Sequence, residues 1–455
     1  MSRRFFETYI NVVRRILPSP YTIALLLTVV TLIIVYAFGN YNQLASSEII
    51  EKWAVGLWEP SLMVFAMQMM LILVLGHALA LSPIVSKIID RLVIPCTTSA
   101  RSAALISIAS MVVGLFNWGL GLIFGAILAR KVGEKAQAEH RKINYGLIGA
   151  AGYSALLIWH GGISGSSLIK VAENGHIQSL MGSEYASMLP TMISLGDTVF
   201  SPMNIIISIG LIVLVPAVLF AVGRFSEGQV PSISVDLPHT SDSLQIIGTE
   251  KLDRSMLFSR ITGMMLFAYC VYLLLSLDSA LSFFTPNNIN FLLLSLCLLS
   301  HESISAFVAS IERAVVGAAG ILIQFPLYFG ILALMKSSGL IEAFSSFLIE
   351  HSSESSFPII TFISAGIVNI FVPSGGGQWA IQGPIIIQSS LELGIPLNKG
   401  ILALAYGDEV TNMLQPFWAL PLLGITQLGA RDILPYTLVM FLTASAIFVL
   451  GLFAL

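Results

Sequence analysis

The apolar segment 357–391 is interrupted by the stretch Val372-Pro373-Ser374-Gly375-Gly376-Gly377-Gln378-Trp379. Its glycines, its proline and its polar side chains cannot continue a helix that faces lipid, because hydrocarbon offers no partner for the freed N–H and C=O groups. Irregular backbone at this depth is tolerated only against protein or around a polar cavity. Membrane carriers use such broken helices to direct helix N-termini at an anion and unwound carbonyls at a cation. The stretch therefore predicts a transport site.

The composition is that of a membrane protein. Of 455 residues, 56% are hydrophobic and 10% are charged, and the mean hydropathy is +0.87. Soluble proteins carry about 25% charged residues. The net charge of −3 and the lack of a basic tail give no support for a nucleic-acid partner, and we expect none. Cys96, Cys270 and Cys297 lack metal-binding spacing, so we expect buried small side chains.

Most of the apolar runs approach the roughly 20 residues that a spanning helix needs. They are 19–38, 60–81, 143–169, 197–222, 257–277, 289–300, 313–336, 399–424 and 433–454. Residues 1–18 are expected to form an amphipathic segment on the membrane surface. The segments 100–131 and 357–391 each hold two apolar arms around a Gly-rich centre, and fit re-entrant hairpins or pairs of full spans. We therefore expect an all-α polytopic membrane protein with broken helices.

The distribution of charge predicts the orientation, because basic residues gather on the cytoplasmic side. Arginines before the first span and the basic run Arg130–Lys142 mark this side, whereas Glu48–Glu59 and Glu342–Glu354 mark the outer side. The N-terminus is then cytoplasmic and the C-terminus periplasmic. Segment 100–131 enters from the inside, and segment 357–391 from the outside.

The two halves of the chain resemble each other. Gln68 and Gln324 stand in similar contexts at an offset of 256 positions, and Phe116–Gly121 aligns with Phe371–Gly376 at an offset near 255. Together with the opposite orientations, these matches predict an inverted-topology repeat, the architecture of many secondary transporters. The expected organisation is a first membrane repeat, a cytoplasmic linker and a second membrane repeat, over residues 19–222, 223–256 and 257–455.

Four elements are predicted to meet at the site: the two hairpin tips and the breaks at Trp159–Ser167 and Tyr406–Trp418. Unpaired amides and hydroxyls there can bind a carboxylate, and glycine lets a ligand approach the backbone. None of the four contains Arg or Lys, which favours a small monocarboxylate over a dicarboxylate or phosphate. The candidate substrate-binding residues are Asn117, Trp118, Gly119, Ser164, Ser374, Gly375, Gly376, Gly377, Gln378, Trp379, Phe417 and Trp418. Close packing of glycines and anchoring by tryptophans remain alternatives.

A second group of residues is a candidate for binding the coupling ion. An intramembrane carboxylate is a functional hypothesis by default, which selects Asp408, whereas the adjacent Glu409 can be structural. Amide and hydroxyl oxygens can hold a cation. The candidates are Asp408, Asn412, Asn117, Thr411 and His160, although His160 can instead bond a neighbour. The expected metal is Na⁺ only, and no other cofactor is expected.

An enzyme is the alternative from a different class of function. Gly162-Ile163-Ser164-Gly165 has the form found around nucleophiles of intramembrane serine proteases. A nucleophilic serine needs a general base from another helix, and the sequence offers only remote histidines. We therefore expect no enzyme and keep a hydrolase using Ser164 as the alternative.

Several motifs resemble the short-chain fatty acid transporter family. They are Phe116-Asn-Trp-Gly-Leu-Gly, Gly196-Asp-Thr-Val-Phe-Ser, Val372-Pro-Ser-Gly-Gly-Gly-Gln-Trp-Ala-Ile-Gln-Gly-Pro and Asn412-Met-Leu-Gln-Pro-Phe-Trp. The resemblance implies uptake of acids such as acetoacetate or butyrate across a bacterial inner membrane. It also implies a remote link to the ion-transporter superfamily of carboxylate carriers, whose members commonly form dimers.

We therefore expect a secondary carrier that imports a short-chain monocarboxylate with Na⁺ or H⁺, as a homodimer in the lipid bilayer. A Na⁺/H⁺ antiporter, or another carboxylate carrier of the same superfamily, remains the alternative. The acid, the ion and their stoichiometry stay open.

Overall fold

A computed structural model describes residues 18–38, 46–182, 188–226, 228–233, 249–277, 283 and 285–454. Over these ranges the chain is helical, with one isolated bridge between Ile143 and Gln229 and no strand. Seven of the described helices are long and apolar enough to cross a membrane. Residues 1–17 of the predicted amphipathic segment, and residues 227 and 234–248 of the predicted linker, lie outside the described part.

The first half contains α2 (Pro20–Phe38), α3 (Ser46–Gly56), α4 (Pro60–Leu81), α5 (Pro83–Leu92), α6 (Ser99–Phe116), α7 (Trp118–Ala138), α8 (Tyr145–Gly152), η2 (Tyr153–Leu157), α9 (Ser166–Lys170), α10 (His176–Met181) and α11 (Pro202–Phe225). The second half contains α12 (Glu250–Asp253), α13 (Met256–Ser276), α14 (Pro286–Ser300), α15 (Ile304–Val315), η4 (Val316–Ala318), α16 (Ala319–Ser337), α17 (Leu340–Glu350), α18 (Phe357–Phe371), α19 (Gly375–Glu392), α20 (Leu397–Thr411), η5 (Asn412–Leu414), α21 (Pro416–Thr426) and α22 (Ala430–Ala454).

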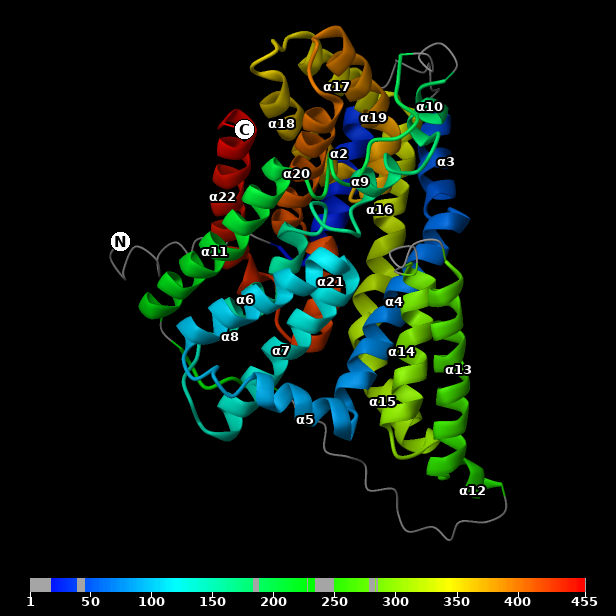
Figure 1. The fold of residues 1–455 in the computed structure, drawn as a ribbon, viewed down its shortest axis with the longest axis vertical. Helices are drawn as coiled ribbons and strands as arrows, with labels where there is room; N and C mark the ends of the chain where they lie inside the picture. The colour runs from blue at the N-terminus through cyan, green and yellow to red at the C-terminus, as the bar shows by residue number, and fades with distance from the viewer. Residues whose placement is uncertain are drawn as a thin grey trace.

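The helices form two groups that lie side by side (Figure 1). The lateral bundle comprises α2, α3, α4, α13, α14, α15 and α16, in which α14 packs on α4 and α13, and α16 packs on α2 and α3. The hairpin bundle comprises α6, α7, α8, α11, α18, α19, α20, α21 and α22, in which α18 packs on α20 and α6 packs on α7 and α11. The two bundles touch where α4 meets α7 and where α16 meets α21.

Two helical hairpins lie in the hairpin bundle, and each tip turns at a capping residue. Asn117 ends α6 and begins α7, and its side-chain Oδ1 accepts the amide of Leu120 at 3.0 Å. Ser374 begins α19, and its Oγ accepts the amide of Gly377 at 3.2 Å. Such caps satisfy helix amides that have no partner within the helix. The tips therefore form at the two stretches that the sequence predicts.

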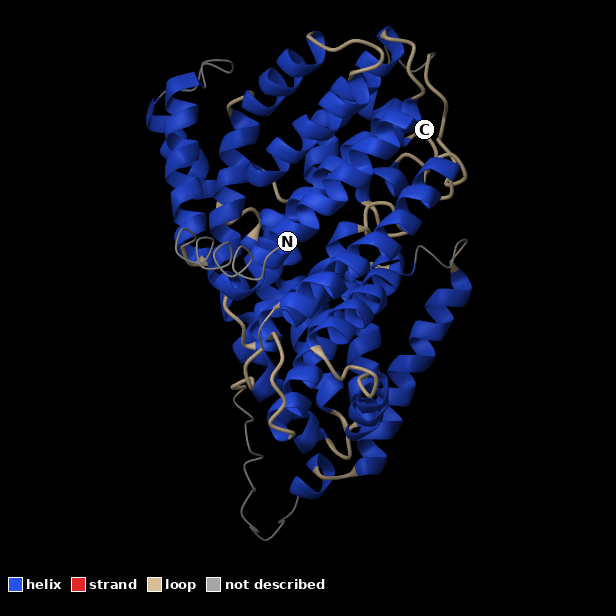
Figure 2. Ribbon diagram, turned by 90° about the vertical axis from the view of Figure 1, so that its left-hand side faces the viewer, coloured by secondary structure: helices blue, strands red, loops and turns tan. Residues whose placement is uncertain are grey.

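The hairpins enter the fold from opposite ends. In Figure 1, α5, which leads into α6, lies in the lower part of the view, and α17, which leads into α18, lies at the top. The side view in Figure 2 shows the same helical body, with loops at its two ends and further loops midway along it. The inverted repeat stays a prediction, as does the choice between re-entrant and spanning hairpins.

Two segments predicted as crossings are interrupted. The segment 143–169 is helical as α8, tightens into the 3₁₀ turn η2 and is irregular from Ile158 to Gly165 before α9. The segment 399–424 is interrupted at η5 and at Gln415, which is extended with φ −96° and ψ 119°. Gln415 precedes Pro416, and the proline ring disfavours helical backbone in the preceding residue. Both breaks thus follow from local sequence.

Other boundaries differ from the sequence expectations. The helix α4 coincides with the predicted run 60–81, but the run 313–336 starts earlier, at Ile304, and passes through α15 and η4 into α16. The sequence did not predict the short helices α3, α5 and α17, since they lie at the ends of longer helices and lack a membrane-length apolar run. Cys96, Cys270 and Cys297 are free and buried, as expected.

Candidate functional site

The tip of the first hairpin is joined to the first break. The amide of Trp118 donates to Ser164 Oγ at 3.1 Å, and the amide of Ile163 donates to the carbonyl of Leu115 at 2.8 Å. A Cβ atom at Gly162 would overlap the backbone of Leu115, so only glycine permits this approach. The break and the tip therefore form one unit at this edge of the site.

The tip of the second hairpin lies against the same break. A Cβ atom built on Gly375 would come within 2.6 Å of His160 Nε2 and 2.9 Å of Ser166 Oγ, closer than carbon atoms approach in proteins. A Cβ atom at Gly376 would meet nothing within 4 Å. Adjacent glycines thus have different roles, because Gly375 allows close packing and Gly376 borders open space.

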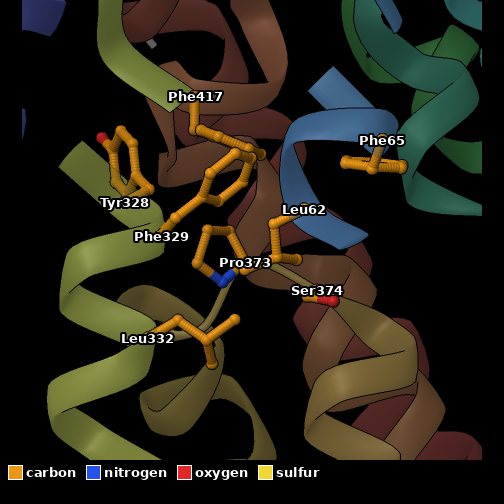
Figure 3. A pocket seen from close by; sticks show the side chains of 8 residues that line it. All are labelled: Leu62, Phe65, Tyr328, Phe329, Leu332, Pro373, Ser374 and Phe417. Carbon is orange, nitrogen blue, oxygen red and sulfur yellow. The ribbon is translucent and has the colours of Figure 1, made fainter. Parts of the chain in front are cut away.

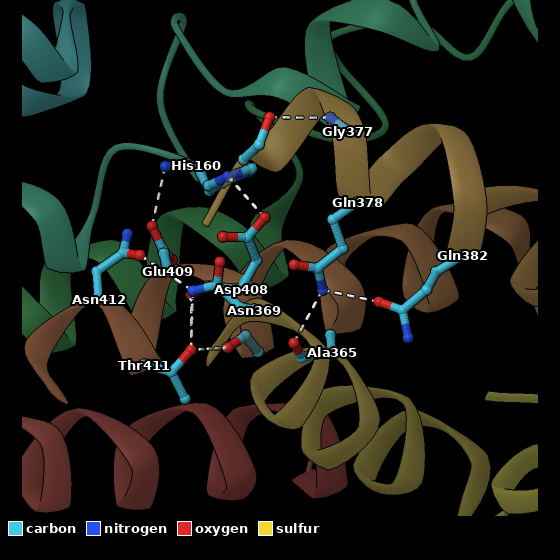
Figure 4. Close-up of polar contacts among 12 residues, drawn as sticks. His160, Ala365, Asn369, Gly377, Gln378, Gln382, Asp408, Glu409, Thr411 and Asn412 are labelled. Atoms are coloured by element: carbon cyan, nitrogen blue, oxygen red, sulfur yellow. Dashed lines mark hydrogen bonds and ion pairs between the residues drawn. The ribbon is translucent and has the colours of Figure 1, made fainter. Parts of the chain in front are cut away.

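A buried histidine faces two buried carboxylates (Figure 4). His160 Nε2 lies 3.4 Å from Asp408 Oδ2, which makes an ion pair when the ring is protonated. The amide of His160 donates to Glu409 Oε2 at 2.9 Å. His160 is 0% exposed, and each carboxylate residue is 1% exposed. Asp408 therefore faces the ring, whereas Glu409 fixes the backbone of the break.

Two residues that were not predicted as site residues, Asn369 and Tyr153, hold the segment from Asp408 to Asn412 at the end of α20. The Asn369 side-chain amide donates to the Asp408 carbonyl at 2.6 Å, to Thr411 Oγ1 at 2.9 Å and to Asn412 Oδ1 at 3.1 Å. The Tyr153 hydroxyl donates to the carbonyl of Asn412 at 2.9 Å. A lone Asn in the apolar run of α18 is a signal for such a role, since polar side chains are costly in a membrane interior.

Several buried polar atoms of this cluster form no hydrogen bond within the described residues, including Asn412 Nδ2 and both ring nitrogens of His160. Asp408 Oδ2, Asn369 Oδ1 and Gln415 Oε1 are buried and form no hydrogen bond within the described residues. The Gln415 side chain is bonded through its amide to the Asn369 carbonyl. Buried polar atoms are normally paired, so unpaired acceptors in one place favour a cation or a proton there. No group of three or more His, Cys, Asp or Glu that could hold a metal occurs in the described ranges.

Two cavities border the hairpin tips. The hairpin cavity, of about 460 Å³, is bordered by both tips and the first break. Its lining includes Met69, Ile72, Asn117, Trp118, Gly119, Ile163, Ser164, Gly165, Ser166, Ile169, Lys170, Glu173, Thr285, Pro286, Ile289 and Gly376. The aromatic cavity, of about 200 Å³, is lined by Leu62, Phe65, Tyr328, Phe329, Leu332, Pro373, Ser374 and Phe417 (Figure 3).

An aromatic wall lies between the two cavities. Phe65, which lines the aromatic cavity, lies 6.5 Å between ring centroids from Trp118, which lines the hairpin cavity. Trp418 packs against both rings, at 6.3 Å from Phe65 and 5.0 Å from Trp118. Phe417 stacks on Phe325 at 4.1 Å. The second hairpin reaches both cavities, through Ser374 and Gly376.

The predicted substrate residues therefore fall into three sets. The first set lies on the hairpin cavity and consists of Asn117, Trp118, Gly119, Ser164 and Gly376. The second set lies on the aromatic cavity and in the wall between the cavities, and consists of Ser374, Phe417 and Trp418.

The third set, on the second hairpin, faces neighbouring helices. Gln378 donates to the Ala365 carbonyl at 2.8 Å and to Gln382 Oε1 at 2.7 Å (Figure 4). Trp379 Nε1 donates to His176 Nε2 at 3.0 Å. Gly375 packs on His160, and the Gly377 amide is bonded to Ser374.

The candidate coupling residues divide in a similar way. Asp408, Thr411, Asn412 and His160 lie in one buried cluster. No hydrogen bond joins Asn117 to this cluster among the described residues, and its Oδ1 caps α7 instead. Lys170 and Glu173 were not predicted as site residues, but they line the hairpin cavity directly beyond the first break.

The surroundings of Ser164 do not favour a nucleophile. Its Oγ accepts the amide of Trp118, and no general base bonds to it within the part of the chain that is described. A serine nucleophile needs such a base within hydrogen-bonding reach. The Ser164 hydroxyl therefore holds the tip of the first hairpin to the first break.

Comparisons with known proteins agree with the motifs. A family model described as "Short chain fatty acid transporter" matches residues 1–455. A putative short-chain fatty acid transporter of Haemophilus influenzae is 34% identical over 459 residues, which cover 99% of each chain. The corresponding protein of Escherichia coli K12 is 35% identical over 459 residues, covering 99% of this chain and 98% of the relative.

Two solved structures are also similar over most of the chain. The YdaH transporter of Alcanivorax borkumensis matches with a TM-score of 0.43 and 17% identity, covering 95% of this chain and 98% of that one. MtrF of Neisseria gonorrhoeae, described as illuminating a class of antimetabolite efflux pumps, matches with a TM-score of 0.40 and 13% identity, covering 98% and 97%.

The resemblance drawn from the motifs is confirmed by the family match, and the hydrolase alternative is set aside, because the family and its curated relatives are transporters. The chain, a multi-pass membrane transporter, belongs to the short-chain fatty acid transporter family.

Proposed function

We propose that this protein imports a short-chain monocarboxylate, such as acetoacetate or butyrate, coupled to Na⁺ or H⁺. One observation carries the proposal: both hairpin tips and the first break border one cavity, and the same break contributes His160 to the buried pair with Asp408 of α20. The segment Trp159–Ser167 thus contributes to the substrate site and also contacts Asp408 through His160. Movement of this segment would connect substrate binding to ion binding.

The tip of the second hairpin would bind the substrate carboxylate. The amides of Gly375 and Gly376 have no hydrogen-bond partner within the described residues, and they begin the 18-residue helix α19. A helix N-terminus favours an anion through its free amides and its dipole. Gly376 also borders the hairpin cavity, which gives a ligand access to its amide. These features support a carboxylate at Gly376.

The aromatic cavity would hold the alkyl end of the acid. It begins at Pro373 and Ser374, close to the proposed carboxylate position, and its other lining residues are aliphatic or aromatic. Its volume of about 200 Å³ favours a chain of a few carbons over a long fatty acid. Apolar lining with a few polar groups at one end is the usual form of a small-molecule site.

The coupling ion would bind at Asp408. A single buried carboxylate is costly in a membrane unless a positive charge offsets it. His160 would provide that charge if its ring were protonated, and Na⁺ held by the oxygens of Asp408, Asn369 and Gln415 would provide it as well. No further cofactor is needed.

An antiporter that exchanges Na⁺ and H⁺ is the second candidate. The pair of His160 and Asp408 lies outside the lining of both cavities, so it can bind an ion while no carboxylate is bound. The antiporter hypothesis predicts a Na⁺ flux that is driven by a pH gradient and needs no organic acid.

The remaining features follow from the sequence. We propose a bacterial inner membrane, a cytoplasmic N-terminus, a periplasmic C-terminus, an inverted repeat and a homodimer. The hairpin bundle would move against the lateral bundle. This motion must separate close contacts between the bundles, such as that between Gly317 of η4 and Gly424 of α21. If a crosslink between the two bundles left transport intact, this motion would be refuted.

The decisive experiment is uptake of radiolabelled butyrate and acetoacetate into proteoliposomes, with Na⁺ and pH gradients imposed separately. Uptake driven by one gradient, and lost in Ser374→Ala with the protein intact, supports the carrier and identifies its ion. Absence of uptake of any short acid under either gradient would remove the substrate assignment and favour the antiporter.

A further inference from the structure

The hairpin cavity has one cationic side chain in its described lining, and a carboxylate neutralises it. Lys170 Nζ lies 2.8 Å and 3.1 Å from the two carboxylate oxygens of Glu173. Each of the two side chains is 50% exposed, and both belong to the cavity lining. The pair therefore borders the space that an entering anion would occupy.

The position of this pair follows from the break. The helix α9 has only five residues, and Lys170 stands in its last turn, directly after the residues that contact both hairpin tips. The chain then turns, and the amide of Ile193 returns to the carbonyl of Val171 at 2.8 Å. This backbone bond anchors the base of the loop, so Lys170 is held at the edge of the cavity while its long side chain stays free to turn.

We infer that Lys170 is a specificity-determining residue that selects the ionised carboxylate of the substrate. Glu173 pairs with Lys170 until the substrate carboxylate takes its position. This inference rests on the proposed function and deepens it. A carboxylate substrate and the Glu173 carboxylate present the same chemical group to the ammonium of Lys170. Glu173 is therefore a tethered competitor, which the substrate displaces.

The strength of the pair suits such an exchange. Ion pairs between exposed side chains contribute from nothing to about 1 kcal/mol, because water screens both charges. A competitor of that strength is displaced easily, and it changes the apparent affinity of the site by no more than about fivefold. A stronger pair would close the site to weakly bound monocarboxylates.

The two partners should have opposite effects on the KM of uptake. In Lys170→Gln the substrate loses an attractive charge, so we expect the KM to rise roughly two- to fivefold with little change in the maximal rate. In Glu173→Gln the competitor is removed, so we expect the KM to fall. The double variant should have a KM below that of Lys170→Gln, since removal of the lysine alone leaves the Glu173 carboxylate unpaired beside the incoming anion. Lys170→Arg should restore a KM near that of the unaltered protein.

A second lysine provides a matched control. Lys131 on α7 lies 3.4 Å from Glu134, with the same spacing of three residues, and it is absent from the lining of both cavities. Lys131→Gln should leave the KM unchanged. The unaltered protein should also lose apparent affinity at higher ionic strength, and Lys170→Gln should be less sensitive, because salt screens exposed charges.

The test is proteoliposome uptake of butyrate at varied concentration, for the five variants named above. Shifts of KM in the same direction for Lys170→Gln and Glu173→Gln would overturn the inference, because a purely structural ion pair loses as much from either change. If the unaltered protein transports no short acid, the proposed function fails separately. The role of Lys170 is then tested by butyrate binding, measured as quenching of tryptophan fluorescence, with Trp118 in the same cavity as the reporter. Equal Kd values in the unaltered protein and in Lys170→Gln would refute the role of Lys170, and so would absence of binding to both.

Discussion

The close approach of Gly375 to His160 makes a specific prediction about two adjacent glycines. In Gly375→Ala, the new methyl group would lie 2.6 Å from His160 Nε2 and 2.8 Å from Cε1 of the same ring. The ring is completely buried, and the amide of the residue is tied to Glu409, so it has little freedom to withdraw. In Gly376→Ala, the methyl group would enter open space.

The magnitude follows from packing. Forcing an additional methyl group into a tightly packed region typically costs about 1–3 kcal/mol. Replacing glycine by alanine within a helix contributes up to about 1 kcal/mol in the opposite direction, and less at a helix end. We expect Gly375→Ala to destabilise the protein by about 1–2 kcal/mol, and Gly376→Ala to leave its stability unchanged or slightly raised.

The assay is thermal unfolding of the purified protein in detergent, measured for both variants with and without His160→Ala. Removing the imidazole ring should relieve the strain, so Gly375→Ala should cost less in the His160→Ala background than in the unaltered protein. A double-mutant cycle isolates this coupling. If the two glycine variants unfold alike, or if His160→Ala gives no relief, the packing of the second tip against the first break is refuted.

Three further results are expected. Asp408→Asn should abolish acceleration of uptake by an ion gradient while exchange of labelled for unlabelled butyrate persists, because only the coupling charge is removed. Phe417→Leu should enlarge the aromatic cavity and favour longer acids by about fourfold for each added CH₂, as measured by inhibition of butyrate uptake with pentanoate and hexanoate. Burial lowers the pKa of His176; the nearby Glu173 raises this pKa and Lys170 lowers it further. The ring is therefore neutral at pH 7 and accepts the hydrogen bond from Trp379 Nε1. Stability from this bond should be present above the ordinary pKa of about 6.5 and lost as the pH falls below it, and the acid-induced change in tryptophan fluorescence should be absent in His176→Gln.

Local sequence predicts where the backbone breaks. Proline, glycine and capping side chains act within a few residues, so the tips at Asn117 and Ser374 and the breaks before α9 and α21 can be located without tertiary information. The same reasoning identifies Asp408, because a carboxylate within an apolar run needs a partner wherever the fold places it. Each of these features is determined by residues that are close together in the sequence, within the length of one helix.

Contacts between distant segments could not be predicted in this way. The amide of His160 bonds a carboxylate 249 positions away, and Gln378 turns toward α18 although the sequence placed it at the substrate. Whether a polar side chain on a hairpin faces a cavity or its partner helix depends on how the helices are rotated about their axes. Lys170 was missed for a related reason, since it follows the predicted break and reaches the cavity only through the fold.

The charges of the site suggest why substrate and ion would move together. At the edge of the hairpin cavity Lys170 pairs with Glu173, and in the buried cluster His160 Nε2 lies 3.4 Å from Asp408 Oδ2. A bare monocarboxylate would add an unbalanced negative charge to a segment that must cross hydrocarbon, where a charge is costly. One Na⁺ or one proton at Asp408 cancels that charge, whereas two cations would leave an unbalanced positive charge. Within the proposed mechanism, electroneutrality thus favours one ion for each acid.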